Sequence, residues 1–245
     1  MDDLIQTLKE MLEESRVVSF LGGAGVSTES GIPDFRSEGS AREAERRYGY
    51  PPEVLLSHEF FLKHTETFYN YYKSMLLTQA HPNPAHYALA RLEKQGKLNA
   101  VSTQNIDNLH QQAGSKRVYP LHGNVEWNRC MQCNKLYDGD YVRRSRGVPR
   151  CEECGGIIKP EVVLYGEALD QIVWRGAMAA ISSADMLIVG GTSLVVYPAA
   201  SLVEYFMGKY LVLINKSETP YDERAHLVIR APIGQVLEQA VPQEA

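Results

Sequence analysis

The sequence predicts an α/β fold in which a doubly wound parallel sheet carries a smaller inserted domain. Short apolar runs that resemble buried strands alternate along the chain with helical patterns, and this alternation is typical of a parallel sheet. Two long stretches, residues 37–79 and 126–159, interrupt the alternation. The chain has 245 residues, of which 44% are hydrophobic and 22% charged, so it can bury one large core or two smaller ones.

Short apolar runs predict the strands of the main sheet. Each run holds a few residues and is bounded by turn residues or by a helical pattern. The last three runs carry no charge, as expected of strands that are buried on both faces. The expected strands are residues 16–21, 99–102, 117–121, 162–164, 186–189 and 211–215.

Helical periodicity and helix-end residues predict the helices between these strands. In the first helix, apolar residues recur at helical spacing. In the second, Asn83 is the expected cap, Pro84 occupies the first helical position and Gly96 follows the end. Gly114 ends the third helix in the same way. The expected helices are residues 4–14, 84–95, 107–113 and 172–181, and a further helix is expected to begin near Pro198.

The two interrupting stretches differ in composition from the rest of the chain. Residues 37–79 are rich in tyrosine and helical in pattern, and residues 126–159 contain all four cysteines. We expect these stretches to be insertions that together form the small domain. The main domain is then discontinuous, and its expected parts are residues 1–36, 80–125 and 160–245.

Charge and hydropathy argue against two classes of partner. A net charge of −5 and a pI near 5.8 disfavour nucleic acid, because proteins that bind it gather excess lysine and arginine. Residues 186–203 are uncharged and reach the lower limit of length for a membrane span. The glycines at 190 and 191 and Pro198 instead predict a strand, a turn and the start of a helix, so no membrane partner is expected.

The four cysteines are arranged as two pairs. Cys130 and Cys133 form one C-x2-C pair, Cys151 and Cys154 form the other, and the interval between the pairs falls within the range of zinc ribbons. Four thiolates complete a tetrahedron around Zn²⁺ and leave no open position, so the ion is expected to be structural. The alternatives are two disulfides or four free thiols. No secretory segment is recognised at the N-terminus, so we expect reduced thiols and a cytoplasmic location.

A glycine-rich turn follows the first strand. Residues 22–28 are Gly-Gly-Ala-Gly-Val-Ser-Thr, and such a turn before a helix brings backbone N–H groups to a pyrophosphate. The match to the dinucleotide-binding pattern is partial, because Thr28 replaces the third glycine and no ribose-binding acid follows at the usual distance. The alternative is a turn that only packs strand against helix. With this turn the main domain is predicted to be Rossmann-like, and the small domain to be a helical module plus a zinc ribbon.

Polar residues follow several of the predicted strands. The carboxyl ends of parallel strands meet at one edge of a sheet, where open α/β sheets bind ligands. We therefore expect these residues to converge on one crevice. Asp107 is alternatively a helix cap, and His122 is alternatively a hydrogen-bonded strand-end residue. The residues are Gln104, Asn105, Asp107, His122, Thr192, Ser193 and Asn215.

Together these motifs resemble the sirtuins, the NAD-dependent protein lysine deacylases, in a short bacterial form. The resemblance extends in order over nearly the whole chain. It includes the paired cysteines. The other matching motifs are Gly23-Ala24-Gly25-Val26-Ser27, Gly31-Ile32-Pro33-Asp34-Phe35-Arg36, Thr103-Gln104-Asn105-Ile106-Asp107, Leu121-His122-Gly123, Gly166-Glu167, Gly191-Thr192-Ser193-Leu194 and Asn215.

The resemblance implies a role for each matching segment. NAD is the co-substrate, and its phosphates would lie at Gly23, Ala24 and Thr28. Phe35 and Arg36 would belong to a loop over the nicotinamide ribose. The other implied contacts fall into three sets: Gln104, Asn105, Ile106 and Asp107 around nicotinamide; Gly191, Thr192, Ser193 and Asn215 on the adenosine side; and Val163 and Tyr165 along an acyl-lysine peptide that adds a strand.

The resemblance also implies a mechanism. Positive charge develops on the ribose as the bond to nicotinamide breaks, and polar groups near Asn105 and Asp107 would favour that state. His122 would be the general base that deprotonates a ribose hydroxyl. The acyl group would pass from lysine to ADP-ribose, and zinc would take no part in the chemistry.

The chain departs from the family pattern in two positions and lacks one further motif. Gly22 stands where threonine is common, and Ser37 stands where glycine usually follows the loop, so slower loop movement is expected. Members that prefer succinyl or malonyl lysine carry Tyr-x-x-Arg in the helical module. No tyrosine of residues 37–79 has arginine three positions later, so an uncharged acyl group is expected.

Two other functions are compatible with the sequence. One keeps the site but transfers ADP-ribose to protein, as a mono-ADP-ribosyltransferase. The other is a zinc-ribbon interaction module with a vestigial nucleotide site, for which residues 143–146 supply the one basic cluster. Deacylation of acyl-lysine proteins or peptides by a monomeric enzyme is the leading expectation.

Overall fold

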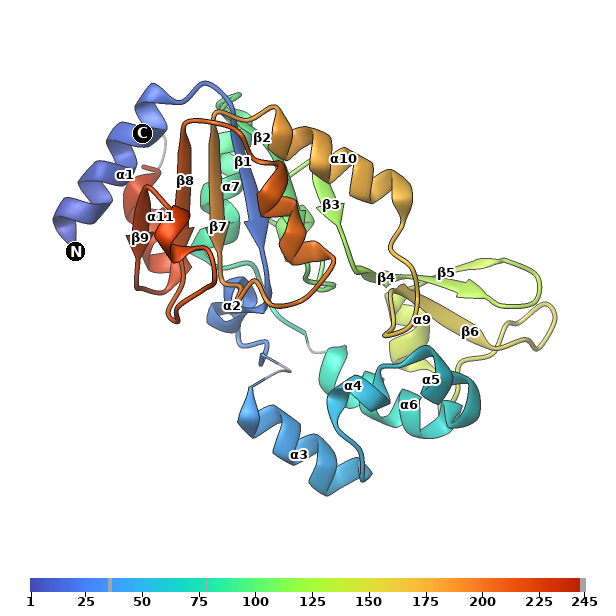
Figure 1. Ribbon diagram of the computed structural model, residues 1–245. Coiled ribbons are helices and arrows are strands. Elements are labelled where there is room, and N and C mark those ends of the chain that lie inside the picture. The colour runs from blue at the N-terminus through green and yellow to red at the C-terminus, as the bar shows by residue number, and fades with distance from the viewer. Residues whose placement is uncertain (35–36, 78, 243–245) are drawn as a thin grey trace.

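A parallel sheet forms the larger part of the molecule. The computed structural model describes residues 1–34, 37–77 and 79–242, and within them this sheet has six strands in the order β3-β2-β1-β7-β8-β9, all paired in parallel (Figure 1). The chain runs outward from β1 to β3 and then returns to β7 beside β1. The doubly wound sheet is therefore confirmed. The strands are β1 (Val18–Gly22), β2 (Leu98–Thr103), β3 (Val118–Pro120), β7 (Met186–Gly190), β8 (Tyr210–Ile214) and β9 (Leu227–Ile229).

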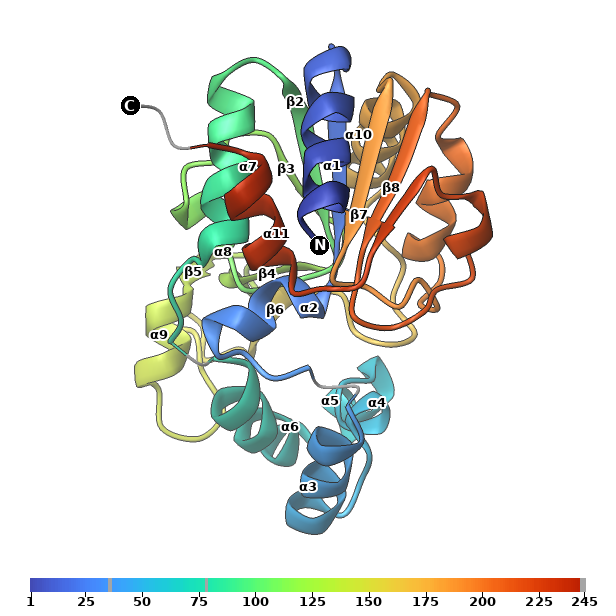
Figure 2. The same cartoon turned by 90° about the vertical axis from the view of Figure 1, so that its left-hand side faces the viewer.

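Helices cover both faces of this sheet. On one face, α1 (Asp2–Glu14), α7 (Pro84–Lys94) and α11 (Ile233–Ala240) lie side by side, as Figure 2 shows. On the other face lie α10 (Gln171–Ser182) and the 3₁₀ helix η3 (Ala199–Tyr205). Alternate residues of β7 point to opposite faces: Ile188 packs with the first group of helices and Leu187 with the second. Both faces of the sheet are thus buried under helices, which explains why its strands carry no charged residues.

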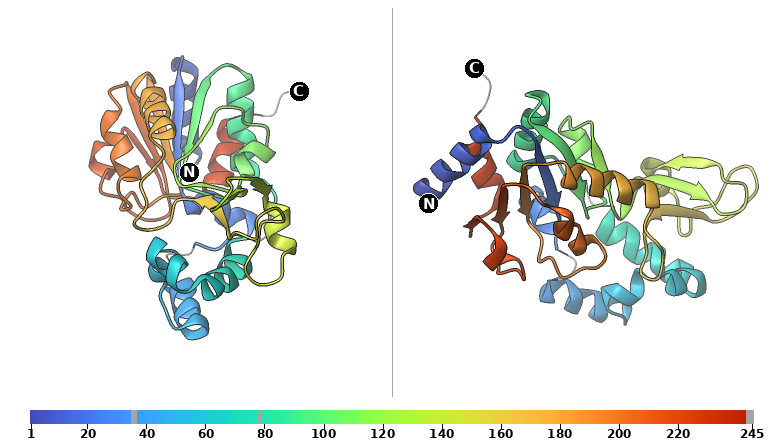
Figure 3. Two further views of the ribbon diagram at one scale, coloured as in Figure 1. Left: turned by 90° about the vertical axis from the view of Figure 1, so that its right-hand side faces the viewer. Right: turned by 45° about the horizontal axis from the view of Figure 1, so that its top comes forward.

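A second, smaller sheet lies beside the carboxyl end of the first. Within the described residues it has three antiparallel strands in the order β5-β4-β6 (Figure 3). The elements of this part are α3 (Glu38–Tyr48), α4 (Pro52–Leu55), α5 (His58–Lys63), α6 (Thr65–Tyr71), the π-helical turn η2 (Tyr72–Leu76), β4 (Gly123–Cys130), β5 (Leu136–Asp138), α9 (Gly139–Arg144) and β6 (Ile158–Val162).

The helical module and the cysteine-containing segment share one apolar core. Phe61 and Tyr69 from the module pack in the same cluster as Val142, Cys151 and Ile158 from the segment. The Tyr69 hydroxyl also donates a hydrogen bond to the carbonyl of Ile158. Two insertions that are distant in sequence therefore bury their apolar side chains against each other rather than against the main sheet.

The local signals at α7 are confirmed. The Asn83 side chain accepts a hydrogen bond of 2.9 Å from the Ala85 amide, and Pro84 is the first helical residue. Gly96 has a φ of 75°, a left-handed conformation that favours glycine just past a helix end. The expected helix of residues 107–113 is shorter, because α8 (Leu109–Gln112) begins only after Asn108, which has a φ of 65°.

One predicted strand is wrong in its placement. Residues 162–164 were expected in the parallel sheet, but β6 ends at Val162 and pairs with β4 in the antiparallel sheet. Of the residues that follow, Val163 is half-buried, Leu164 is buried and Tyr165 is exposed, so this segment is not covered on both faces. A run of three apolar residues fits a strand of either sheet. The helix expected near Pro198 is present as η3, and it is 3₁₀ rather than α.

The remaining short elements are α2 (Ala24–Ser27), the 3₁₀ turn η1 (Thr28–Ser30) and the 3₁₀ turn η4 (Asp222–Arg224). Residues 186–203 form β7, a turn and most of η3, as the glycines predicted. In the part of the chain that the structure describes, no helix has both the length and the apolar character needed to span a bilayer.

Candidate active site and metal centre

The crevice lies where the order of strands reverses, between the carboxyl ends of β1 and β7. The glycine turn after β1 packs directly on the turn after β7, and the Gly25 amide donates a 2.8 Å hydrogen bond to the Gly191 carbonyl. A Cβ atom on Gly25 would lie only 2.7 Å from the Gly191 Cα, so this close approach requires glycine. The packing role considered from the sequence is therefore real. It also brings the two turns to the place where open sheets bind ligands.

Side chains from three strand ends meet in this crevice. The side-chain nitrogen Nδ2 of Asn105 donates to Ser27 Oγ at 2.9 Å, and Ser27 Oγ donates to Asp107 Oδ2 at 2.6 Å. Gln104 Nε2 donates to Thr192 Oγ1 at 3.0 Å. The predicted convergence is thus confirmed for the residues that follow β2 and for Thr192 after β7, and Ser27 after β1 joins them although it was not predicted. Each hydrogen bond fixes a side chain in one orientation.

Asp107 bonds the first turn of a helix and also faces the crevice. Its Oδ1 accepts a 3.0 Å hydrogen bond from the Leu109 amide at the start of α8. Burial raises the pKa of this carboxyl above its ordinary value, although hydrogen bonds from Ser27 and from the Leu109 amide act in the opposite direction. The helix-cap alternative holds only in part, because Asn108 is the N-cap residue of α8 and Asp107 bonds the Leu109 amide from the position before it, with Oδ2 directed at Ser27.

His122 lies just beyond β3, where the chain enters the small sheet. Its Nδ1 lies 3.0 Å from the carbonyl oxygen of Gln104. A carbonyl oxygen can only accept, so in the neutral imidazole Nδ1 carries the proton and Nε2 carries the lone pair. The tautomer that can take a proton through Nε2 is thus the one that this backbone contact selects.

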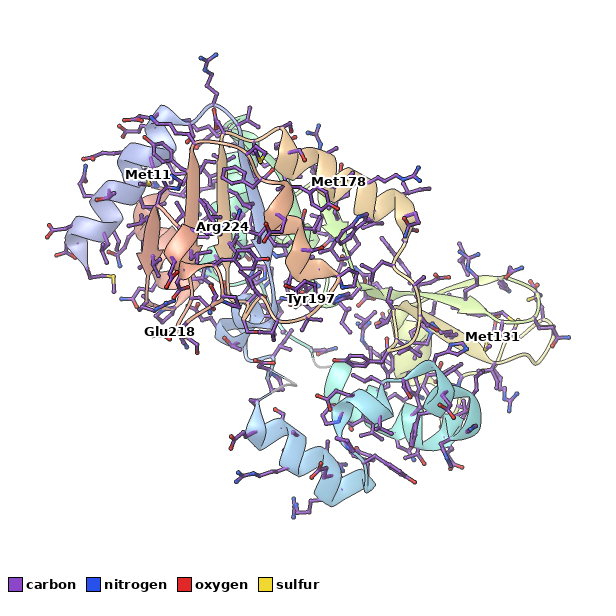
Figure 4. All side chains as sticks on the ribbon, in the orientation of Figure 1. Met11, Met131, Met178, Tyr197, Glu218 and Arg224 are labelled. Atoms are coloured by element: carbon purple, nitrogen blue, oxygen red, sulfur yellow. The ribbon has the colours of Figure 1, made fainter. Side chains whose placement is uncertain are left out.

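A cavity of about 260 Å³ joins these groups to the small domain. Polar side chains of the main sheet form one wall, and side chains of the small domain form the opposite wall. Tyr197, which Figure 4 labels between the main sheet and the small domain, belongs to its lining. The lining residues are Ala24, Ser27, Ile32, Pro33, Asp34, Pro52, Glu53, Leu56, Gln104, Asn105, Ile106, Asp107, His122, Val162, Val163, Leu164, Tyr165, Gly166, Glu167, Leu169, Val196, Tyr197 and Pro198.

The cavity brings together some of the residues expected from the sequence and not others. The cavity is lined by Gln104, Asn105, Ile106, Asp107, His122, Ala24, Val163 and Tyr165. Four further residues follow β7 and β8 outside this cavity: Gly191, Thr192, Ser193 and Asn215. Gly23 and Thr28 flank the turn, and the Thr28 hydroxyl donates to the Gly25 carbonyl at 3.0 Å. Phe35 and Arg36 lie outside the described residues.

Of the wall that faces the strand ends, the sequence indicated Val163 and Tyr165 but missed the other residues. Pro52, Glu53 and Leu56 come from the helical module, and Val196 and Tyr197 come from the loop before η3. These segments reach the cavity only through tertiary packing, and no local pattern marks them. The only sequence signal that this module has a separate role was that residues 37–79 interrupt the alternation of strands and helices.

Replacing Asp107 by asparagine is expected to alter how stability depends on pH. Because burial raises the carboxyl pKa, the folded state holds the proton more tightly than the unfolded state. The stabilisation that this carboxyl group gives the folded state is therefore fully present below its unfolded-state pKa of about 4. It is lost as the pH rises through the folded-state pKa. The asparagine side chain has no carboxyl group to ionise, so the free energy of unfolding of Asp107→Asn should rise relative to that of the wild-type protein as the pH increases above about 4.

Urea unfolding of both proteins at several pH values measures this difference. Each unit by which the folded and unfolded pKa values differ corresponds to about 1.4 kcal/mol. Glu43→Gln, at an exposed position of α3, is the matched control and should follow the wild-type curve. An Asp107→Asn difference that stays constant across the range would contradict the pKa shift.

The four cysteines lie close enough together to bind one ion. Their sulfur atoms lie within 4.8 Å of one another. Cys130 Sγ is 3.4 Å from Cys154 Sγ, and Cys133 Sγ is 3.5 Å from Cys151 Sγ. A disulfide bond measures about 2.0 Å, whereas four Zn–S bonds of about 2.3 Å in a tetrahedron separate the sulfurs by about 3.8 Å. The sulfur geometry therefore fits zinc and excludes the two disulfides considered from the sequence.

Local contacts shape each cysteine pair into a turn. The Asn134 amide donates to the Cys130 carbonyl at 3.0 Å, and the Gly155 amide donates to the Cys151 carbonyl at 2.9 Å. Asn134 and Gly155 both have left-handed φ values, of 62° and 73°. The Tyr137 hydroxyl donates to Cys151 Sγ at 3.1 Å, a contact that stabilises the thiolate form, which is the form that binds metal.

The chain is similar to proteins of one family over nearly its whole length. The family model described as the Sir2 family matches residues 23–198. The NAD-dependent protein deacetylase of Clostridium acetobutylicum is 56% identical over 241 residues, which are 98% of this chain and 98% of that protein. The NAD-dependent protein deacetylase of Clostridium perfringens is 56% identical over 243 residues, which are 98% of this chain and 100% of that protein.

Solved structures agree with the sequence comparison. A structure described as Sir2 with a p53 peptide and NAD+ is 42% identical, covers 96% of this chain and 96% of its own, and has a TM-score of 0.85. Another, described as showing the structural basis for the mechanism and regulation of Sir2 enzymes, is 38% identical, covers 98% of this chain and 97% of its own, and has a TM-score of 0.87. The resemblance to the sirtuins is confirmed, and the chain belongs to the Sir2 family.

Proposed function

We propose that this chain is an NAD-dependent protein lysine deacetylase. The observation that carries the proposal is one cavity with the Asn105–Ser27–Asp107 hydrogen bonds and His122 on one side and Val163 and Tyr165 on the other. Relatives named NAD-dependent protein deacetylase match almost the whole chain. Solved relatives were obtained with NAD+ and a peptide, and with an acetylated peptide.

The reaction consumes NAD as a second substrate. NAD supplies a ribose whose bond to nicotinamide breaks as the acyl oxygen of the lysine side chain attacks the anomeric carbon. The products, after water is taken up, are lysine with a free amine, nicotinamide and acylated ADP-ribose. The task of the protein is to hold the reacting groups together, to favour the positive charge on the ribose and to move one proton.

His122 moves the proton in this proposal. The contact from Nδ1 to the Gln104 carbonyl orients the ring and leaves the lone pair on Nε2. Nε2 then accepts the proton of a ribose hydroxyl, and that oxygen attacks the carbon of the former acyl group. Gln104 itself is anchored by Thr192, so the position of the base is tied to the end of β7.

Asn105 and Asp107 support the departure of nicotinamide. The hydrogen bonds through Ser27 hold the amide and the carboxylate in place before substrate binds. A fixed carboxylate in a buried site favours positive charge that develops nearby, more strongly than a mobile one in water. Gln104 and Ile106 complete the pocket that we assign to nicotinamide.

The backbone between β6 and Glu167 limits how a peptide can bind. The Val163 amide donates to the His122 carbonyl and the Tyr165 amide to the Leu56 carbonyl, both at 2.9 Å. Leu164 N–H is also used within the chain, by Glu167. Among the described residues the Val163 carbonyl has no assigned partner. We propose that it accepts a hydrogen bond from the acyl-lysine side-chain amide, and that the substrate runs along Val163 and Tyr165.

The NAD contacts outside the cavity follow the same proposal. Gly23, Ala24 and Thr28 lie at the glycine turn and are assigned to the phosphates. Phe35 and Arg36, which follow Asp34, are assigned to the loop over the nicotinamide ribose. The adenosine end is assigned to residues that follow β7 and β8, which are Gly191, Thr192, Ser193 and Asn215.

We also propose two domains, a monomeric state and a cytoplasmic location. The small domain has its own apolar core, which supports the division expected from the sequence. Because β4 and β6 extend across the expected boundaries at residues 126 and 159, we place these boundaries at Gly123 and Val162. The acidic net charge of −5 supports protein rather than nucleic acid as the substrate.

The function is tested with an acetyl-lysine peptide and NAD. We expect the peptide to lose its acetyl group and one acetyl-ADP-ribose and one nicotinamide to form for each acetyl group lost, as measured by mass spectrometry. A peptide that keeps its acetyl group while ADP-ribose is added to protein would favour the transferase alternative. A protein that consumes no NAD in either assay would favour the interaction module.

The charge of the cavity predicts which acyl groups are accepted. No lysine or arginine lines it among the described residues, whereas four carboxyl groups do: Asp34, Glu53, Asp107 and Glu167. The free carboxylate of a succinyl or malonyl group would be repelled by these groups, and like charges brought together cost several kcal/mol. We therefore expect kcat/KM for a succinyl-lysine peptide to be at least about 100-fold lower than for the acetyl-lysine peptide.

An uncharged acyl group of similar length separates charge from size. A butyryl-lysine peptide has nearly the same chain length as the succinyl peptide but no carboxylate. If charge decides, butyryl-lysine should be the better substrate of the two. Equal kcat/KM for the butyryl and succinyl peptides would show that the charge of the cavity does not decide which acyl groups are accepted.

A further inference from the structure

Glu167 is the acidic residue that connects the substrate-binding segment to the rest of the small domain. It lies between β6 and α10, lines the cavity, and has a side chain that is 19% exposed. Gly166, with a φ of 89°, turns the chain so that the Glu167 amide donates to the Leu164 carbonyl at 2.9 Å. The side chain therefore points back over the segment that precedes it.

The Glu167 carboxylate receives donors from three segments. Oε2 accepts from the Leu164 amide at 2.9 Å and from Lys159 Nζ at 3.1 Å. Oε1 lies 2.7 Å from Nδ1 of His58 on α5. The residues that meet here come from β6, from the helical module and from the segment itself. We call Glu167, His58 and Lys159 the carboxylate clamp.

The clamp completes the support of the peptide-binding backbone. Two amides of this segment are held by backbone carbonyls, those of His122 and Leu56, and the His58 amide donates to the Tyr165 carbonyl at 2.9 Å. The Leu164 amide lies between them and is held by a side chain instead. If this donor were released, the segment would lose its central attachment while both flanking attachments remained.

We propose that Glu167 is a positioning residue that fixes the Val163 carbonyl and the Tyr165 backbone for the acyl-lysine substrate. This inference rests on the proposed function. Burial acts to raise the pKa of Glu167, but the Leu164 amide, His58 and Lys159 together outweigh it and hold the pKa below its ordinary value. The group is therefore ionised at neutral pH, and all its donors are drawn to one fixed charge.

The test is a set of clamp variants assayed with the full-length protein. In Glu167→Ala we expect KM for the acetyl-lysine peptide to rise about tenfold or more, which is of the order expected for a lost hydrogen bond to a charged group. We expect kcat and KM for NAD to stay within about threefold of the wild type, because the NAD contacts do not involve this segment. Glu167→Gln keeps an acceptor for the Leu164 amide, so it should recover most of the peptide affinity.

A matched control separates positioning from a general loss of stability. Glu161 on β6 is also a carboxylate in an ion pair, with Arg129 at 2.5 Å, but it does not line the cavity. Glu161→Ala should leave KM for the peptide unchanged. If Glu167→Ala melts too early to assay, Lys159→Met and His58→Ala each remove one clamp partner and should raise peptide KM by smaller factors.

Peptide binding without NAD distinguishes the two ways in which the inference can fail. Fluorescence anisotropy with labelled acetylated and unacetylated peptides measures it directly. Wild-type protein that binds the two peptides equally would overturn the proposed function. Wild-type protein that prefers the acetylated peptide, together with Glu167→Ala that binds it equally well, would overturn the clamp alone.

Discussion

Replacing His122 by alanine is expected to reduce turnover of the acetyl-lysine peptide by about 100- to 10,000-fold, which is the range for a general base. The imidazole lies at the junction of both walls of the cavity, and its Nδ1 contact with the Gln104 carbonyl presents the Nε2 lone pair. Alanine cannot accept a proton. His122 is the one imidazole that lines the cavity among the described residues, so no second side chain of its kind is placed to replace it.

The fold of this variant should be retained. The backbone carbonyl of His122, which accepts from the Val163 amide, is unaffected by the substitution. The side chain is only partly buried, so its removal creates little cavity. Melting temperature and peptide binding should therefore stay close to those of the wild type.

Two measurements locate the defect of His122→Ala. Exchange of labelled nicotinamide into NAD reports cleavage of the glycosidic bond, which precedes the step assigned to His122. We expect this exchange to persist while acetyl-ADP-ribose formation is lost. His64→Ala, at an exposed position after α5, is the control and should turn over normally. Full turnover by His122→Ala would end the assignment of this residue as the base.

The parts of the fold that were predicted correctly depend on local signals. Asn83, Pro84 and Gly96 define α7 because a cap, a first-turn proline and a left-handed glycine each act over a few residues. The run at residues 162–164 was misplaced because three apolar residues carry no information about which sheet they join. The strand β4 was not predicted at all, since Glu126 and Arg129 interrupt its apolar character.

The strand-end side of the candidate site was predictable from topology, whereas on the opposite side only Val163 and Tyr165 were indicated, through the family resemblance. Parallel strands must end at the same edge, so the topology alone places Gln104, Asn105 and Asp107 near Thr192. The opposite wall depends on how the helical module docks, and that is set by a core shared between two insertions. The contacts of Glu167 with His58 and Lys159 arise from the same docking, so the sequence could identify a matching motif there but not its role.

Removing the metal is expected to have the largest effect on stability. Cys130 and Cys151 are buried within the small-domain core, so the ribbon and the helical module are held together around the thiolates. Structural zinc contributes about 10–16 kcal/mol in small zinc-binding peptides, which is comparable to the whole stability of a typical domain. We expect Cys130→Ala, or the wild-type protein after chelation, to bind less than one zinc per chain and to melt at a much lower temperature or aggregate.

Activity should be lost with the metal even though zinc takes no part in the reaction. Four protein ligands leave the ion no open position, but Leu56, Val162 and Leu164 belong both to the cavity wall and to its supporting core. The matched control is Met131→Ala, because Met131 lies between the paired cysteines, in the part of the small sheet where Figure 4 labels it, and is 48% exposed. That variant should keep one zinc per chain by mass spectrometry and wild-type activity. If Cys130→Ala instead melted and turned over like Met131→Ala, the ribbon could not be what holds this wall in place.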